Sequence, residues 1–338
     1  MGGRGAQSDR EAHWNEPLGC PSQRRTHPYP ETITEKGYVN LVRLLIEAAP
    51  VVFEGSHFAM KGGTAINLFV ADMPRLSVDI DLVFADHRVG RNEALQSIAD
   101  ALASMRRALA RQGIEAEVVA SKSGEESKLF IRRDLNLVKV EANHVFRGTV
   151  LPVEVRTLVP EARALFATGM SVKTLAVPEL YGSKLVAAMD RQHPRDLFDV
   201  LGLYASFGLT PEIVDCFVCY LAGHNRPVHE VLFSRPIDIT GAFENEFAGM
   251  TRKSVTLDEL FAVRERLQAE LPATLLPEHK RFLVSLVAAE PEWDVAPCPH
   301  LSEMPAIRWK LENLRKLKRS NPQKFARQSN ELTDRLGI

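Results

Sequence analysis

The chain has 338 residues, a formal net charge of −1 and four cysteines. Its length allows two domains and a sizeable core, and its near-neutral charge excludes a global field that would attract nucleic acid, so such binding would need a local patch. No apolar run approaches a membrane span, no secretion signal opens the chain, and the cysteines indicate no disulfide framework, so we expect a cytoplasmic protein with no membrane partner.

The first half of the chain mixes helical and strand patterns. Residues 1–30 are rich in glycine and proline with little apolar patterning, which predicts a disordered extension. The elements then predicted are a helix over 33–53, a turn opening a short helix within 60–69, a strand at about 77–84, a helix over 91–112, and strands at 115–120, 128–132 and 136–142.

From Pro178 onward the pattern is helical almost throughout. The predicted helices cover 178–190, 195–206, 211–223, 256–270, 277–288, 303–319 and 322–336. This order of elements predicts an α/β domain over 31–160 and a helical domain over 161–338.

Two aspartates form the most informative pattern. Asp79 and Asp81 flank Ile80 in an apolar strand, and side chains two apart on a strand share a face. Neighbouring carboxylates repel each other and need a compensating positive charge. Mg²⁺, or Mn²⁺, bound together with substrate phosphates would supply that charge, so the pair predicts a metal site.

A glycine turn precedes the aspartates. Gly62 and Gly63 allow a ligand to approach the backbone, and Thr64 can cap a helix whose N–H groups would face an anion. The turn matches neither a P-loop nor a dinucleotide fingerprint, and alone it would be an ordinary turn. Together with the aspartates it predicts a metal-dependent nucleotide site.

A third carboxylate has two candidates. Glu141 lies in an alternating stretch that places it on the same face as Lys139, and Glu154 lies in a second alternating stretch. The pattern alone does not choose between them.

Charged residues on the next two helices are candidates for binding phosphates. Lys184 and Arg191 are seven residues apart, so they share a helical face and would grip a triphosphate or remain surface cations. Asp196 and Asp199 also share a face, and the alternative for them is a helix start whose acidic side chains complement the dipole.

Basic residues crowd the C-terminal helices around Trp309. They are Arg308, Lys310, Arg315, Lys316, Lys318, Arg319, Lys324 and Arg327. They suit contacts with a phosphate backbone, and a solvated helical face is the alternative.

Taken together, these residues resemble the AbiEii/AbiGii (MenT-like) toxin family, which are nucleotidyltransferase toxins of type IV toxin–antitoxin and phage-defence systems. The likeness runs from about residue 36 to 336 and rests on short strings in a fixed order. They are 61–65 (KGGTA), 75–82 (RLSVDIDL), 139–143 (KVEAN), 184–191, 195–199 (RDLFD) and 307–314 (IRWKLENL).

The resemblance implies an α+β, polymerase-β-like nucleotidyltransferase fold, with a mixed sheet flanked by helices and a helical C-terminal domain. It favours Glu141 over Glu154, and it implies NTP as substrate and a cognate antitoxin as partner. Some members of the family modify the 3′ acceptor end of tRNA, so we expect that end as the acceptor here. The resulting site has catalytic residues Asp79, Asp81, Lys184 and Asp199, metal ligands Asp79, Asp81 and Glu141, and nucleotide-binding residues Lys61, Gly62, Gly63, Thr64, Ser77, Arg191 and Asp196. Asp199 would either orient Lys184 or act as a general base, and both roles stay open.

Three other functions remain compatible with the sequence. The first is nucleotidyl transfer to a protein or a small molecule. The second is transfer of phosphate in place of a nucleotide. The third is a non-catalytic module that binds nucleotide and acts by protein contact, which the presence of both aspartates and Lys184 argues against.

Overall fold

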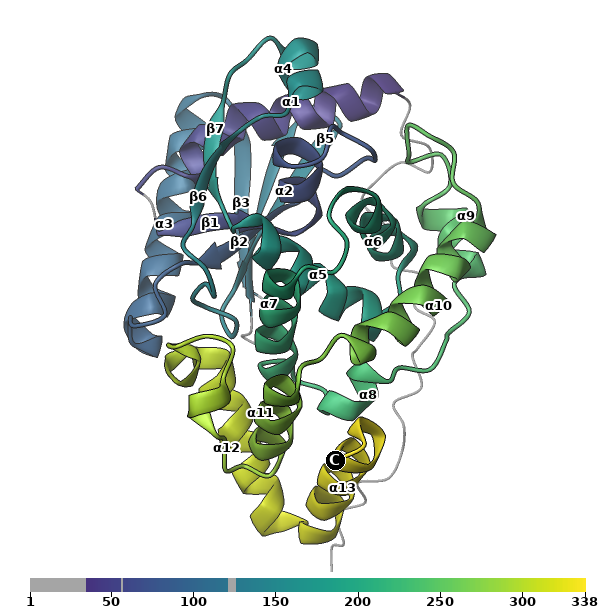
Figure 1. Ribbon diagram of the computed structural model, residues 1–338. Helices are drawn as coiled ribbons and strands as arrows, with labels where there is room; N and C mark the ends of the chain where they lie inside the picture. The colour runs from purple at the N-terminus through teal and green to yellow at the C-terminus, as the bar shows by residue number, and fades with distance from the viewer. Residues whose placement is uncertain (1–34, 56, 121–125) are drawn as a thin grey trace, which may run out of the picture. The chain divides into compact units, whose positions relative to one another are not determined.

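The computed structural model describes residues 35–338 except residues 56 and 121–125 (Figure 1). The predicted disordered extension, 1–30, lies outside the described residues. Residues Thr34–Ile338 form one compact unit. None of the helices within the described ranges is long and apolar enough to cross a bilayer.

Seven strands form one mixed sheet. They are β1 (Phe58–Lys61), β2 (Ile80–Phe84), β3 (Glu115–Ala120), β4 (Glu126–Arg133), β5 (Asn136–Asn143), β6 (Glu154–Thr157) and β7 (Ser171–Thr174). Their order is β3-β4-β5-β2-β1-β7-β6, with β2 parallel to β5, β1 parallel to β7, and the other neighbours antiparallel. The predicted mixed sheet is therefore confirmed.

Helices pack around the sheet and then dominate the rest of the chain (Figure 1). The first four are α1 (Glu35–Val52), α2 (Gly62–Phe69), α3 (Arg91–Arg111) and α4 (Pro160–Phe166). The others are α5 (Val177–Asp190), α6 (Pro194–Ser206), α7 (Pro211–Ala222), α8 (Val228–Leu232), α9 (Thr240–Glu246), α10 (Leu257–Ala273), α11 (Pro277–Val287), α12 (Pro305–Ser320) and α13 (Pro322–Leu336). α1 packs on β5, α3 on β3 and β4, and α2 against β1, β2 and α5.

The aspartate strand is shorter than predicted. β2 begins at Ile80, so Asp79 immediately precedes the strand and only Asp81 lies within it. Ile80 and Leu82 are fully buried, whereas Asp81 stays partly accessible. The period-two alternation therefore separates core from site, as the pattern predicts.

The helix that carries Lys184 packs closely on α7. A Cβ added to Gly182 would lie 2.6 Å from Cβ of Cys216 and 2.7 Å from the backbone nitrogen of Phe217. Only glycine lets the two helices approach this closely, so the sequence of α5 sets how far this helix lies from its neighbour.

Replacing Gly182 by Ala is therefore expected to lower the free energy of unfolding by about 1–3 kcal/mol, because the helices must separate. Gly202 provides the matched control, since it also lies inside a helix but has nothing within 4 Å of an added Cβ. Gly202→Ala should stabilise the protein by about 0.5–1 kcal/mol. Urea denaturation measures both, and equal effects of the two substitutions would contradict the packing argument.

Candidate active site

The glycine turn joins β1 to α2 and lies directly beside Asp81. Gly62 has a φ of +78°, and an added Cβ would lie 2.1 Å from Oδ2 of Asp81. A side chain here would thus be strained by its backbone and would also collide with the carboxylate. No side chain within the described residues caps the start of α2, which leaves its first N–H groups available to an anion.

Gly62→Ala should lower the stability by about 1–3 kcal/mol and slow nucleotide transfer by about 10²-fold, because the Asp81 carboxylate has to move. Gly113→Ala is the control, since Gly113 has a φ of +72° but nothing within 4 Å of its Cβ position. The control should lose stability and keep its transfer rate. Unfolding curves and initial rates distinguish the two effects, and a slow Gly113→Ala variant would assign the loss to general destabilisation.

Four charged side chains cross the sheet in one row. In the strand register, Asp81 on β2 lies directly across from Lys61 on β1 and from Glu141 on β5. Glu141 in turn lies directly across from Lys128 on β4. Burial raises the pKa of the Asp81 carboxyl above its ordinary value, and the ammonium group of Lys61 only partly offsets this. The nearby carboxylates of Glu141 and Asp79 raise that pKa further.

This crowding of acidic groups fits a divalent cation. Asp79 and Asp81 both line the cleft and offer hard oxygen donors, which is the chemistry that Mg²⁺ and Mn²⁺ prefer. Within the described ranges, no group of three or more His, Cys, Asp or Glu side chains is arranged to hold a metal ion. An ion here would therefore rely on the two aspartates and on oxygens from a substrate.

The two candidates for the third carboxylate lie in different places. Glu141 is two strand positions from Asn143 on β5 and forms ion pairs with Lys128 at 2.9 Å and Lys139 at 3.1 Å. These lysines lower the pKa of Glu141, although burial opposes them. Glu154 lies on the edge strand β6, where it pairs with Arg156 at 2.8 Å. Of the two, only Glu141 is adjacent to the aspartates.

Lys184 is held by two buried carboxylates. Its Nζ donates to Oδ1 of Asp196 at 2.8 Å and lies 3.0 Å from Oδ2 of Asp199. Burial alone would lower the pKa of Lys184, but the two aspartates raise it above its ordinary value. Arg191 also donates to Asp196, with Nη2 at 2.9 Å from Oδ1. An ammonium group has three donors, so one N–H of Lys184 stays available to a ligand.

Arg75 also lines the cleft, although it was not among the site residues predicted from the sequence. It is only 4% exposed, and its Nε and Nη2 both donate to the carboxylate of Asp199 at 2.7 Å. Arg75 and Lys184 together lower the pKa of Asp199, although burial opposes them. Both oxygens of Asp199 are thus engaged, and Asp199 is not part of the cleft lining, which favours an orienting role over a general base.

Arg75 also connects this cluster to the glycine turn. Its backbone N–H donates to the side chain of Asn67 at 3.2 Å, and Asn67 donates to the carbonyl of Gly63 at 2.8 Å. A Cβ on Gly63 would lie 2.4 Å from Nη2 of Arg75. Thr64 and Ser77 join the same turn through their hydroxyl groups, 3.0 Å apart. The sequence signal that could have identified Arg75 as a site residue is its position at the start of the string 75–82, two residues ahead of Ser77.

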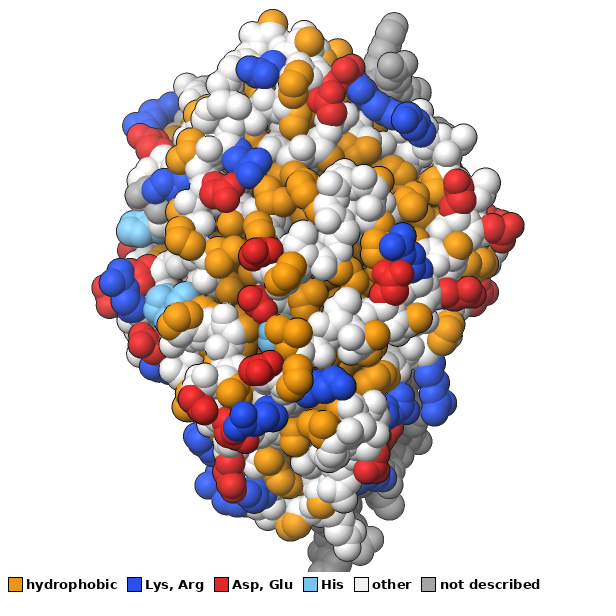
Figure 2. Space-filling view, in the orientation of Figure 1, with side chains coloured by type: hydrophobic (Ala, Val, Ile, Leu, Met, Phe, Trp, Pro, Cys, Tyr) orange, Lys and Arg blue, Asp and Glu red, His pale blue; other side chains and the backbone are white. Residues whose placement is uncertain are grey.

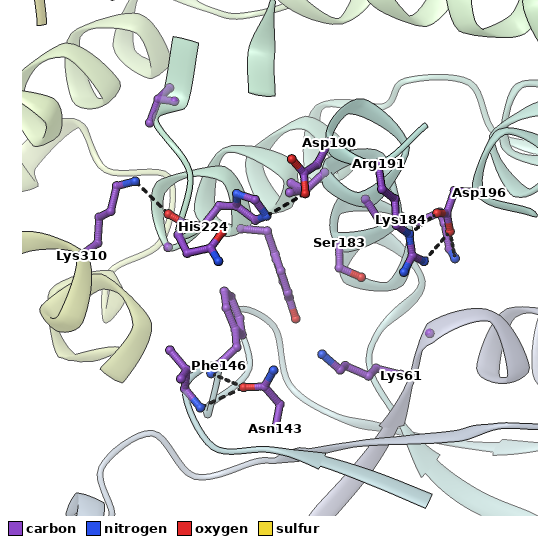
Figure 3. A pocket seen from close by; sticks show the side chains of 18 of the residues that line it. Lys61, Asn143, Phe146, Ser183, Lys184, Asp190, Arg191, Asp196, His224 and Lys310 are labelled. Carbon is purple, nitrogen blue, oxygen red and sulfur yellow. Dashed lines mark hydrogen bonds and ion pairs between the residues drawn. The ribbon is translucent and has the colours of Figure 1, made fainter. Parts of the chain in front are cut away.

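These groups face a cleft of about 800 Å³ between the sheet and the helices (Figure 3). Lys61 and Asn143 point into it from the sheet side, Ser183 faces them from α5, and Arg191, directly after α5, lies beside Asp196 (Figure 3). The predicted site residues that line it are Lys61, Gly62, Gly63, Thr64, Asp79, Asp81, Lys184, Arg191 and Asp196, together with Ser77. Glu141 and Asp199, also predicted as site residues, are not part of this lining.

The cleft continues to the C-terminal helices, where the basic residues differ from one another. Trp309 and Lys324 line its far end. Lys310 is buried, donates to the carbonyls of His224 at 2.8 Å and Arg226 at 2.6 Å, and has its pKa lowered to about 8 by burial. Acidic and basic side chains alternate over the face in Figure 2, so no large single-sign region is visible there.

Comparisons with known proteins agree with this arrangement. A family model described as the nucleotidyl transferase AbiEii toxin of type IV toxin–antitoxin systems matches residues 43–313. No curated protein matches the chain. Among solved structures, MenT4, a nucleotidyltransferase toxin from Mycobacterium tuberculosis H37Rv, is 18% identical with a TM-score of 0.55, and the match covers 82% of this chain and 94% of that one.

At this identity the structural match shows the fold alone, and the predicted α+β nucleotidyltransferase fold is thereby confirmed. The family model covers most of the chain and adds the activity class. The chain belongs to the AbiEii family of nucleotidyltransferase toxins from type IV toxin–antitoxin systems.

Proposed function

We propose that this chain transfers the nucleotidyl group of an NTP to the 3′ hydroxyl of tRNA with the help of Mg²⁺ or Mn²⁺, and that a cognate antitoxin opposes it. The observation that carries the proposal is that the uncapped start of α2, the aspartate pair and the Lys184 cluster all face one cleft. We infer that it acts in the cytoplasm, where NTPs and tRNA are found.

The proposed reaction forms one bond and breaks another at the α-phosphorus. The acceptor oxygen bonds to the α-phosphorus, the bond from that phosphorus to the bridging oxygen of the β-phosphate breaks, and pyrophosphate leaves while the hydroxyl proton is released. A divalent ion held by Asp79 and Asp81, when bound, supplies charge stabilisation on the phosphate oxygens.

The backbone N–H groups of Gly62, Gly63 and Thr64 bind phosphate oxygens at the helix start. Lys184 donates its remaining N–H to the phosphates, where it stabilises the charge that develops on the leaving group. Asp196 and Asp199 keep this ammonium group charged and oriented. Positioning and electrostatics, rather than covalent chemistry, thus account for the activity.

The shape of the cleft supports a polymeric acceptor. It runs from the aspartates to α12 and α13, where Trp309 is 53% exposed and Lys324 adds a positive charge. An exposed aromatic ring beside a cation suits a single-stranded RNA end, because bases stack on the ring while the cation approaches phosphates. The 3′ end of tRNA is single-stranded and offers the required hydroxyl.

The experiment incubates the protein and Mg²⁺ with each of the four α-labelled NTPs and with total tRNA, periodate-oxidised tRNA or total protein. We expect label on intact tRNA only, because oxidation destroys the 3′ hydroxyl. Label from a γ-labelled NTP would indicate phosphate transfer, and label confined to protein would indicate a protein acceptor. Either result contradicts the proposal, and Asp81→Asn serves as the inactive control.

A further inference from the structure

Lys139 lies between two of the acidic side chains predicted to bind metal. Its Nζ is 3.1 Å from Oε1 of Glu141 and 3.7 Å from Oδ2 of Asp79. Mg²⁺ binds oxygen ligands at about 2.0–2.1 Å. An ion shared by Asp79 and Glu141 would therefore need the volume that this ammonium group fills.

We infer that Lys139 is a built-in cation that takes the place of a second metal ion, so that the site binds one divalent ion through Asp79 and Asp81. The inference rests on the proposed function, because it concerns how the same site balances charge around the NTP. Glu141 is then a positioning residue that holds Lys139, and it is not a metal ligand.

Backbone pairing fixes these positions. Val140 on β5 pairs with Ile80 on β2, so the preceding residues, Lys139 and Asp79, lie at the same level. Side chains two apart on a strand share a face, which brings Lys139 and Glu141 together. The placement of the ammonium group thus follows from the register of the sheet as well as from its own ion pairs.

A second lysine holds Glu141 from the other side. Lys128 lies directly across from Glu141 on β4, and its Nζ is 2.9 Å from the same Oε1 atom. Lys128 also pairs with Glu126 at 2.9 Å. The two lysines thus hold Glu141 from both sides. Asp79 and Asp81 are the acids of this cluster that line the cleft.

The cleft meets the same two aspartates. Asp79 and Asp81 belong to its lining, whereas Glu141 and Lys139 are absent from the lining formed by the described residues. An ion that enters with the nucleotide therefore encounters oxygens of the aspartates and not those of Glu141. The ammonium group of Lys61 points into the same cleft, where a nucleotide would meet it (Figure 3).

The test counts Mn²⁺ ions per chain by electron paramagnetic resonance, on the full protein with a saturating α,β-methylene NTP. We expect one ion in the unsubstituted protein and in Lys139→Arg, which keeps the charge. Lys139→Met should bind a second ion, because Asp79 and Glu141 lose their cation. Asp81→Asn, which removes a charged ligand, should weaken the first ion by at least about 10-fold, and Glu141→Gln, which leaves both ligands in place, should weaken it by less.

Two ions in the unsubstituted protein, one ion in Lys139→Met, or equal losses in Glu141→Gln and Asp81→Asn would each overturn the inference. Glu154→Gln, at the far edge of the sheet, controls for the loss of a carboxylate as such. The ion count uses an unreactive analogue, so it does not depend on transfer. If the protein transfers nucleotide but binds two ions, only this inference is rejected. If it binds one ion but transfers no nucleotide, only the proposed function is rejected.

Discussion

Asp81→Asn is expected to reduce nucleotide transfer by at least about 10³-fold. The substitution keeps the shape of the side chain but removes one negative charge from the pair that faces the cleft. Asparagine also replaces a charged oxygen donor with a neutral one, which binds a divalent cation weakly. Initial rates with an α-labelled NTP measure the loss.

The fold should survive this change. Burial and two neighbouring carboxylates already penalise the charged form of Asp81, so a neutral side chain removes repulsion within the sheet. Unfolding curves are therefore expected to show equal or greater stability for Asp81→Asn. Glu154→Gln, on β6, should keep the full transfer rate. An Asp81→Asn variant within about 10-fold of the unsubstituted rate would remove the catalytic role proposed for this residue.

Arg75→Met is expected to lower the free energy of unfolding by about 3–5 kcal/mol, because it leaves Asp199 buried with Lys184 as its remaining partner. Transfer should fall as well, since the side chain of Arg75 holds Asp199, which in turn holds Lys184, and its Nη2 lies beside Gly63 in the glycine turn. Denaturant unfolding and initial rates measure the two effects separately.

A surface ion pair provides the matched comparison for Arg75. Arg252 donates to Glu161 at 2.7 Å, but both side chains are largely exposed. Arg252→Met should leave the unfolding curve unchanged, because water replaces the lost partner. The double variant Arg75→Met/Asp199→Asn should recover part of the stability, since neither charge is then left buried. A double variant less stable than the sum of the two single losses would contradict the pairing.

Local patterns were sufficient to predict the parts of the site that lie close together in sequence. A period of two identifies the faces of β2 and β5, and two glycines before a helix identify the turn, so the sequence named Asp81 and Gly62 as candidates, and both line the cleft. The C-terminal helices followed from their apolar period. Each of these signals depends only on neighbours within a few residues.

Partners that are distant in sequence could not be found in this way. Arg75 and Asp199 are 124 residues apart, and no spacing rule relates them. Strand β1 has four residues without alternation and β7 is equally short, so neither was predicted. The alternation around Glu154 was noted but was too short to delimit β6 as a strand. Lys310 looked like its basic neighbours, because burial is a property of the fold. The boundary at residue 160 stays a prediction.

The alternation on β5 has a consequence for any molecule that folds incorrectly. Val138 and Val140 point into the core while Lys139 and Glu141 face the other way. A slip of β5 by one residue against β2 would bury both charges and expose the valines. A misaligned chain would therefore unfold and contribute no activity. The specific activity of a preparation would then measure the fraction of molecules with the correct strand register.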